Sequence, residues 1–214
     1  MPIIKKPIII LLSALLLSQC GTTLIADQER ADLSVATMYL DFVPGFVKDA
    51  FFINRETGKE YANSRYGWGK EFFPREHRFS FFALGNLPAG TYELTRLQVY
   101  HISSTKMLAI PKDALVFTVA ANEIKFLGQI TITLTDSPAS PTVSTGRRKT
   151  TALSNSAGQN FQISHEDAPD GNDRFRDGEE FFLEFFISKK NALPRWTELA
   201  KKRLAEIEIL KNKL

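Results

Sequence analysis

The chain has 214 residues, with 27 Lys and Arg, 24 Asp and Glu, a formal net charge of +3 and one cysteine. A chain of this length can bury a core without disulfides, and one cysteine excludes a disulfide within it. The near balance of charges, with no clustered basic run, excludes nucleic acid as an expected partner.

The first nineteen residues have the pattern of a signal peptide. Lys5 and Lys6 precede an apolar run over residues 8–17, and this order of charge and hydrophobicity is typical of secretory targeting. A membrane-crossing helix needs about 20 apolar residues, so the pattern predicts a signal helix over 1–19 and no stable membrane-spanning anchor. Its removal takes away two of the 27 basic residues and no acidic one, which leaves 25 against 24.

The stretch "LSQC" at Leu17–Cys20 resembles the lipobox of bacterial lipoproteins. In that motif Leu stands three positions before the Cys and a small residue two before, whereas Gln19 takes a place that usually holds Gly, Ala or Ser. The resemblance implies that Cys20 becomes the first mature residue and carries acyl chains such as palmitate, and two or three chains give lasting membrane attachment. Gly21 stands where lipoproteins of the inner membrane often carry Asp, which favours the outer membrane. The alternative is a secreted protein cut after Cys20 or Gly21.

Residues 20–31 show no clear periodicity and predict a lipidated tether, and residues 32–176 predict a β-sandwich domain. Alternation of apolar and polar residues indicates half-buried strands in this domain. The strands at 115–119 and 124–134 are expected to form a hairpin, with the even-numbered apolar residues of the second strand on one face. The other predicted strands cover residues 33–43, 46–54, both sides of a turn within 77–101, and 161–164.

The turn within residues 77–101 is expected at Pro88 and Gly90, whose backbone preferences suit a tight turn. The surrounding stretch "LGNLPAGTYELTRL" resembles the strand, turn and strand of transthyretin-like and immunoglobulin-like modules in bacterial envelope proteins. This resemblance implies a fold and no functional residue. The expected fold is mainly β, an antiparallel β-sandwich with a C-terminal helical segment of one or two helices and an N-terminal signal helix.

The apolar residues of the second strand in this stretch change from even to odd positions between Leu94 and Leu97. A slip of one residue sends side chains to the opposite face of a sheet. A bulge near Thr95 or Arg96 is therefore expected, because it keeps both sets of apolar residues in one core.

Residues 135–160 are rich in Ser, Thr, Pro and Gly. Their apolar content cannot offset the conformational entropy lost on ordering, so a mobile loop is expected. A weak hairpin around Gly146 is the alternative.

Residues 177–214 predict a C-terminal helical hairpin. Asp177 and Glu180 have the spacing of a capping box at its start. Four phenylalanines between positions 181 and 186 then repeat at helical spacing, although the alternation over 181–187 also suits a strand.

The second predicted helix, residues 195–214, has an apolar stripe at 100° per residue that includes Trp196, Leu199 and Ile207. Arg203 interrupts the stripe, and its stem can lie along the apolar residues with the guanidinium in water. Something must cover this stripe. The sandwich of the same chain is one candidate, and a partner docked on the helix is the other.

The segment "NSRYGWGKEFFPREHRF" interleaves aromatic and basic side chains. Trp, Tyr and Arg carry much of the binding energy at protein interfaces, and aromatic rings also stack on sugars. This segment is the candidate binding surface, with packing in the core or at a strand edge as its alternative role. Its members are Arg65, Tyr66, Trp68, Phe72, Phe73 and Arg75.

No motif for catalysis or metal binding is complete. Ser103 and Lys106 match the S-x-x-K pattern of serine acyl-enzymes, but they follow a predicted strand and do not start a helix. His77 and the other two histidines lack metal-ligand spacing, and the acidic stretch 166–180 lacks the EF-hand pattern. We therefore expect no catalytic residue, no metal site and no cofactor.

These observations predict a lipid-anchored, non-enzymatic lipoprotein of the cell envelope that presents a β-sandwich binding module. Its expected partners are the membrane, through lipidated Cys20, and another envelope protein, a polysaccharide or a host molecule. An accessory or structural subunit of an envelope complex, docked through the C-terminal helix, is the alternative. A small serine hydrolase that uses Ser103 or His77 is the least favoured function.

Overall fold

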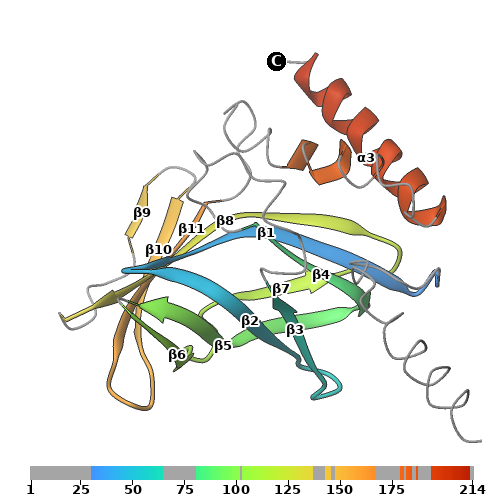
Figure 1. The fold of residues 1–214 in the computed structure, drawn as a ribbon. Coiled ribbons are helices and arrows are strands. Elements are labelled where there is room, and N and C mark those ends of the chain that lie inside the picture. The colour runs from blue at the N-terminus through green and yellow to red at the C-terminus, as the bar shows by residue number, and fades with distance from the viewer. Residues whose placement is uncertain are drawn as a thin grey trace, which may run out of the picture.

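The computed structural model describes residues 30–64, 81–101, 103–136, 143–145, 148–166, 179–180, 182–184, 187 and 194–212. The strands form two sheets (Figure 1). Sheet A has the order β4-β1-β8-β11-β10-β9, and sheet B has the order β3-β2-β5-β6, with β7 also paired to β5. Sheet A comprises β1 (Leu33–Val43), β4 (Phe81–Pro88), β8 (Ile124–Thr135), β9 (Val143–Thr145), β10 (Arg148–Ser154) and β11 (Asn160–Glu166). Sheet B comprises β2 (Phe46–Asn54), β3 (Glu60–Ser64), β5 (Gly90–His101), β6 (Ser104–Ala109) and β7 (Val116–Val119).

The mainly β fold with two packed sheets and a C-terminal helix is confirmed, but β1 and β8 pair in parallel. The expected hairpin of residues 115–119 with 124–134 is wrong, because β7 pairs with β5 in sheet B and β8 lies in sheet A. The connection crosses between the sheets beside Ser34, whose Oγ donates to Ala120 O (2.6 Å) and accepts from the N–H of Glu123 (2.9 Å). Strand β8 therefore begins beside the start of β1 and runs in the same direction.

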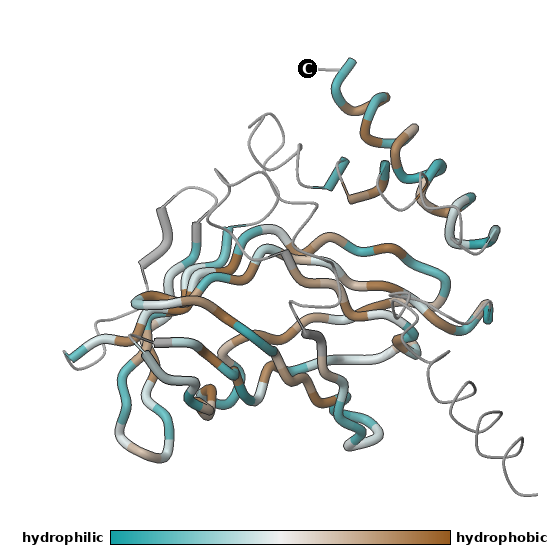
Figure 2. The backbone as a smooth tube through the Cα atoms, in the orientation of Figure 1, coloured by the Kyte–Doolittle hydropathy of each residue, from teal (hydrophilic) through white to brown (hydrophobic). Residues whose placement is uncertain are grey.

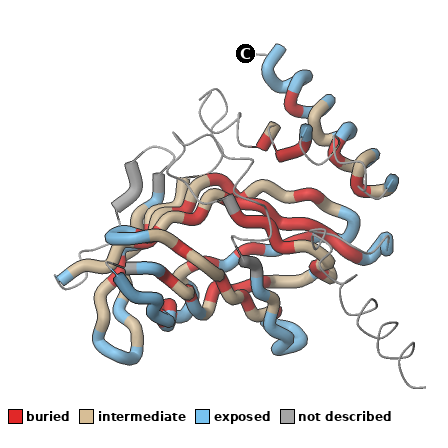
Figure 3. The backbone as a smooth tube through the Cα atoms, in the orientation of Figure 1, coloured by how far each residue is buried: buried red, intermediate tan, exposed pale blue. Residues whose placement is uncertain are grey.

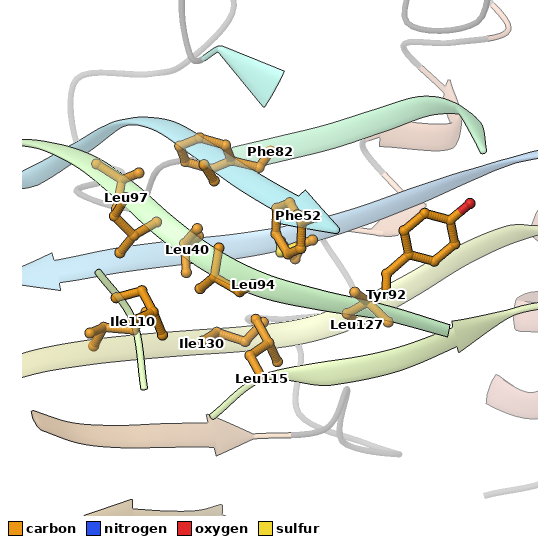
Figure 4. Packing of buried hydrophobic residues seen from close by; sticks show 14 of the residues in the cluster. Leu40, Phe52, Phe82, Tyr92, Leu94, Leu97, Ile110, Leu115, Leu127 and Ile130 are labelled. Carbon is orange, nitrogen blue, oxygen red and sulfur yellow. The ribbon is translucent and has the colours of Figure 1, made fainter. Parts of the chain in front are cut away.

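The main core lies between the two sheets. Its side chains come from both sheets, because each strand turns alternate residues inward. The bulge expected near Thr95 is confirmed, since Phe51 pairs with Arg96 and Phe52 with Leu94, which leaves Thr95 without a partner opposite it in β2. Figure 4 shows this core with ten labelled members, Leu40, Phe52, Phe82, Tyr92, Leu94, Leu97, Ile110, Leu115, Leu127 and Ile130.

A second bulge, in β8, changes which of its side chains enter the main core and which lie on the outer face of sheet A. The pairing with β1 shifts between Thr37 and Tyr39, opposite Gly128, whose φ is 78°. Before the bulge, Ile124 and Phe126 lie on the outer face of sheet A, and after it Ile130 lies in the main core. The prediction that these even-numbered residues share one face is therefore wrong, because alternation cannot be followed across a bulge.

Tyr92 and Gly90 fix the crossing from β4 to β5. The hydroxyl of Tyr92 donates to Pro88 O (2.6 Å), and burial raises the pKa of Tyr92 to about 12. A Cβ atom on Gly90 would lie 2.6 Å from Asn54 Nδ2. The buried Asn54 cannot easily move away, because its Oδ1 accepts from the backbone N–H groups of Glu56 (3.1 Å) and Thr57 (2.9 Å). The close approach of two chain segments therefore requires glycine at position 90.

The mobile loop expected over 135–160 is wrong for most of its second half. Strand β10 pairs with β11 from Arg148↔Glu166 to Ser154↔Asn160. It also pairs with β9, from Arg148↔Thr145 to Thr150↔Val143. The alternative, a hairpin around position 146, is confirmed by the β9–β10 pairing. Threonines favour strands, and the hydroxyls of Thr150 and Ser164 hydrogen-bond across the pair (2.9 Å). Composition alone missed the strands because it does not record the pairing of β10 with β9 and β11, which joins this segment to sheet A through β8.

The C-terminal helices cover the part of the outer face of sheet A that is formed by β1, β4 and the start of β8 (Figure 1). Residues 179–180, 182–184 and 187 are helical, which confirms a helix over the strand alternative for these positions, and α3 spans Pro194–Lys211. Brown and teal positions alternate along α3 in Figure 2, as expected of an amphipathic helix. Helix and sheet share a second apolar cluster, whose buried members are Leu33, Val35, Ala83, Ile124, Phe182, Leu183, Trp196, Ala200 and Ile207.

This helical layer explains the unusual burial of β1. Six consecutive residues at the start of β1, from Leu33 to Met38, are buried (Figure 3). Alternate side chains enter the main core, and the others lie under the helices. A strand covered on both faces carries a long buried run in place of strict alternation.

Polar contacts attach α3 at its start and at its middle. The guanidinium of Arg195 donates to the carbonyl oxygens of Arg30 and Leu33 and to Asn122 Oδ1. Arg203, expected to reach water, instead donates from Nε to Glu179 Oε1 (2.7 Å). Glu179 is buried, so this pairing supplies the partner that a buried carboxylate needs.

Replacement of Trp196 by Ala should lower the free energy of unfolding by about 3 to 5 kcal/mol, because the indole is fully buried between α3 and sheet A. Leu210→Ala, on an exposed position of the same helix, is the matched control and should change it by about 0.5 kcal/mol or less. Urea unfolding of both variants measures the difference. Equal midpoints for the wild-type chain and the Trp196 variant would contradict the packing described here.

Candidate binding surface

Two sets of sequence-predicted site residues lie outside the described part of the chain. One is Cys20, the predicted lipidation site. The other is the aromatic and basic segment with Arg65, Tyr66, Trp68, Phe72, Phe73 and Arg75. Strand β3 ends at Ser64, directly before this segment, in register with Asp49 of β2. The described part of the chain before this segment therefore ends on β3, the edge strand of sheet B.

The residues proposed for a partner-docking helix belong to the core of the chain itself. Trp196 and Ile207 are buried against sheet A, and Leu199 packs partly buried beside them. The apolar stripe of α3 is thus covered by the sandwich, the intramolecular possibility raised by the sequence. The exposed apolar residues of α3 are Ile209 and Leu210, near its C-terminal end.

The outer face of sheet B differs from the outer face of sheet A. No described helix or strand covers it, and its side chains are partly or fully exposed. We call this surface the open face. Its residues come from four neighbouring strands and are Phe46, Asp49, Phe51, Glu60, Arg96, Gln98, Tyr100, Thr105 and Met107.

An aromatic pair stands at one end of the open face. Phe46 begins β2, pairs in register with Tyr100 of β5 and stacks on it with ring centroids 5.1 Å apart. Tyr100 is 38% exposed, and the nearby Val43 is 46% exposed. These side chains lie where β1 turns into β2, at the end of the sandwich opposite Arg30.

A guanidinium and a second aromatic ring occupy the middle of the open face. Arg96 lies over the ring of Phe51, 4.8 Å from its centroid, and its Nη2 contacts Glu60 Oε2 at 2.5 Å. Both charged side chains are nearly half exposed. An ion pair this exposed contributes about 0 to 1 kcal/mol to stability. Arg96 is therefore placed on the open face by two contacts, and its role in the stability of the fold is small.

The most buried ion pair of sheet B has a structural role. Glu93 accepts from Arg55 Nε (2.9 Å) and from the backbone N–H of Asp113 (2.7 Å), and Arg55 also pairs with Asp113. These contacts join the β2–β3 turn, β5 and the connection from β6 to β7. Glu56 accepts from the N–H of Thr91, and this bond lowers the pKa of Glu56.

The residues considered for catalysis are dispersed. Ser103 lies in the turn between β5 and β6, Lys106 is an exposed residue of β6, and His77 lies outside the described residues. His165 Nε2 contacts the carbonyl oxygen of Leu127 (2.7 Å) in sheet A. In the described ranges, no group of three or more His, Cys, Asp or Glu side chains is placed to hold a metal ion.

The open face also has a signal in the sequence, namely aromatic and Arg side chains at outward positions of two predicted strands. Outward positions of the strands at 46–54 and 77–101 carry Phe46, Phe51, Arg96 and Tyr100, side chains that a solvated strand face does not need. The sequence instead favours the segment after residue 64, because its aromatic and basic residues lie close together in the chain. Pairing of β2 with β5 brings the others together, and pairing partners cannot be identified from one sequence.

None of the helices in the described ranges is long and apolar enough to cross a membrane. Comparison with protein-family models, with curated proteins and with solved structures gives no match to this chain.

Residues of the open face should be largely dispensable for folding. Tyr100→Ser should cost about 1 kcal/mol or less, because it removes one exposed ring from a stacked pair. Leu97→Ala, at a buried position of the same strand, should cost about 2 to 5 kcal/mol. Urea midpoints of the two variants test this. Similar costs would mean that the open face is part of the core.

Proposed function

We propose that the chain is a lipid-anchored, non-enzymatic lipoprotein of the cell envelope that binds another protein through the open face of sheet B. The observation that carries this proposal is the difference between the two outer faces. On sheet A, the helices of the same chain cover the outward apolar residues of β1, β4 and the start of β8. On sheet B, no described segment covers the stacked aromatic rings and the Arg96 guanidinium.

The composition of the open face supports a protein partner. Arg and Tyr are enriched among residues that dominate binding energy, and Met and Phe are enriched at interface cores. The Arg96 guanidinium is already held by Phe51 and Glu60. Little side-chain entropy is then lost on binding, and preorganisation of this kind raises affinity.

The position of the open face suits a chain anchored at its N-terminus. Strand β1 starts at Leu33, and its ten steps to Val43 span about 33 Å at 3.3 Å per residue. The Phe46 and Tyr100 pair lies at the far end of this distance. Attachment through Cys20 would therefore leave the aromatic end of the open face directed away from the tether.

Replacement of Cys20 by Ser should release the protein from the membrane fraction. The proposal makes the thiol of Cys20 the attachment point for acyl chains, and a hydroxyl cannot form the thioether. Fractionation of cells followed by a high-salt wash measures this, with the wild-type chain as control. A Cys20→Ser protein that still sediments with membranes after the wash would contradict the lipid anchor.

A photo-crosslinking amino acid at Gln98, in the middle of the open face, should form a discrete adduct with another protein in intact cells. The same amino acid at Lys202, exposed on α3, is the control and should form none. Tyr100→Ser in the Gln98 protein should remove the adduct without unfolding the chain. Adducts at Lys202 alone, or adducts at Gln98 that persist with Tyr100→Ser, would contradict binding through the open face.

A further inference from the structure

Strand β6, Ser104–Ala109, forms one edge of sheet B beside the open face. Among the described strands it pairs with β5 alone. Five of its six residues are exposed, and Met107 is 49% exposed. Natural proteins commonly protect such an edge, because its unpaired backbone groups can bind another strand.

The hydrogen bonds show which backbone groups of β6 point away from β5. The N–H of Ile110 donates to Thr95 O at 2.8 Å, so residue 110 faces β5. In an antiparallel ladder, successive residues direct their backbone N–H and C=O groups to opposite sides. The backbone groups of Leu108 and Lys106 therefore point toward β5, and those of Met107 and Thr105 point away from it. Ala109 fits this order, since its outward carbonyl accepts from Asn155 Nδ2 (3.0 Å) in the β10–β11 turn.

We propose that β6 binds an extended peptide segment of the partner protein as an added strand. The outward N–H and C=O groups of Thr105 and Met107 form the ladder, and Asn155 ends it at Ala109. Main-chain bonds give affinity in this mode, and alternate side chains give specificity. This inference rests on the proposed binding function of sheet B and names the form of the partner.

The side chains of β6 specify the chemistry of the added strand. Lys106 is exposed and forms no ion pair with another described residue. An Asp or Glu directly opposite it makes a favourable cross-strand pair. Met107 offers an exposed apolar side chain on the open face, where an apolar residue of the peptide fits. The expected peptide therefore carries an acidic residue next to an apolar one.

The same lysine disfavours a second copy of this chain as the added strand. Thr105 and Met107 are the residues whose outward donor and acceptor are both available. An antiparallel pair that uses both residues of both copies places Thr105 opposite Met107, which sets Lys106 opposite Lys106. Like charges directly opposite each other are destabilising. A different protein with an acidic strand avoids this repulsion.

Selection of a displayed library of random peptides on the full chain tests the proposal. Enriched peptides should contain Asp or Glu next to an apolar residue. Met107→Pro removes one outward N–H and leaves the bonds to β5 intact, because edge strands accept Pro where the N–H faces outward. It should weaken these peptides about tenfold, whereas Met107→Leu, which keeps the N–H, should stay within about twofold. Equal binding to the Pro variant, or no enrichment at all, would overturn the proposal.

A charge exchange keeps the proposal testable if Met107→Pro does not fold. Lys106→Glu should change the enriched peptides from acidic to basic, and an unchanged preference would overturn the assigned pairing. Failure here is distinguishable from failure of the proposed function. An adduct at Gln98 with no peptide binding at β6 would retain the open face as a binding surface and remove only the added strand.

Discussion

The burial of β1 on both of its faces is the constraint on which the structure depends. This strand pairs with β4 on one side and β8 on the other, and its side chains enter the main core and the layer under α3. Strand β1 can take this central position only because the C-terminal helices cover the outer face of sheet A at β4, β1 and the start of β8. Without them, apolar groups of Leu33, Val35 and Ala83 would face water at about 25 cal/mol for each Å² exposed. The helices are therefore an integral third layer of the domain.

Local sequence patterns were sufficient for the parts of the fold that depend on a single strand or helix. The alternation over Leu33–Val43 and Phe46–Asn54, the shift near Thr95 and the periodicity of α3 each leave a signal within a few residues. Parts that depend on pairing between distant segments left no such signal. The connection from β7 to β8 hydrogen-bonds to Ser34, which is 86 to 89 positions away, and the β10–β11 hairpin joins sheet A through the pairing of β11 with β8.

The candidate site shows the same limit in a different form. The sequence suggested a binding surface of interleaved aromatic and basic residues in one continuous segment after Ser64, with packing in the core or at a strand edge as the alternative. On the described surface, Phe51 and Arg96 are 45 positions apart, and they meet because the β5 bulge sets Arg96 opposite Phe51. A function assigned to adjacent residues is easy to read from a sequence. A surface assembled across strands requires the register, which one sequence does not contain.

The contact of Arg195 with the start of the chain has a mechanical consequence. Its guanidinium donates to the carbonyl oxygens of Arg30 and Leu33, so α3 is hydrogen-bonded to the first described residues and to the start of β1. A pulling force applied at residue 30 along the strand would act parallel to β1 and load its bonds to β4 and β8 in shear. Bonds loaded in shear must break together, whereas bonds at the end of a hairpin can open one at a time. The N-terminal end of this domain is thus built to resist tension along the chain.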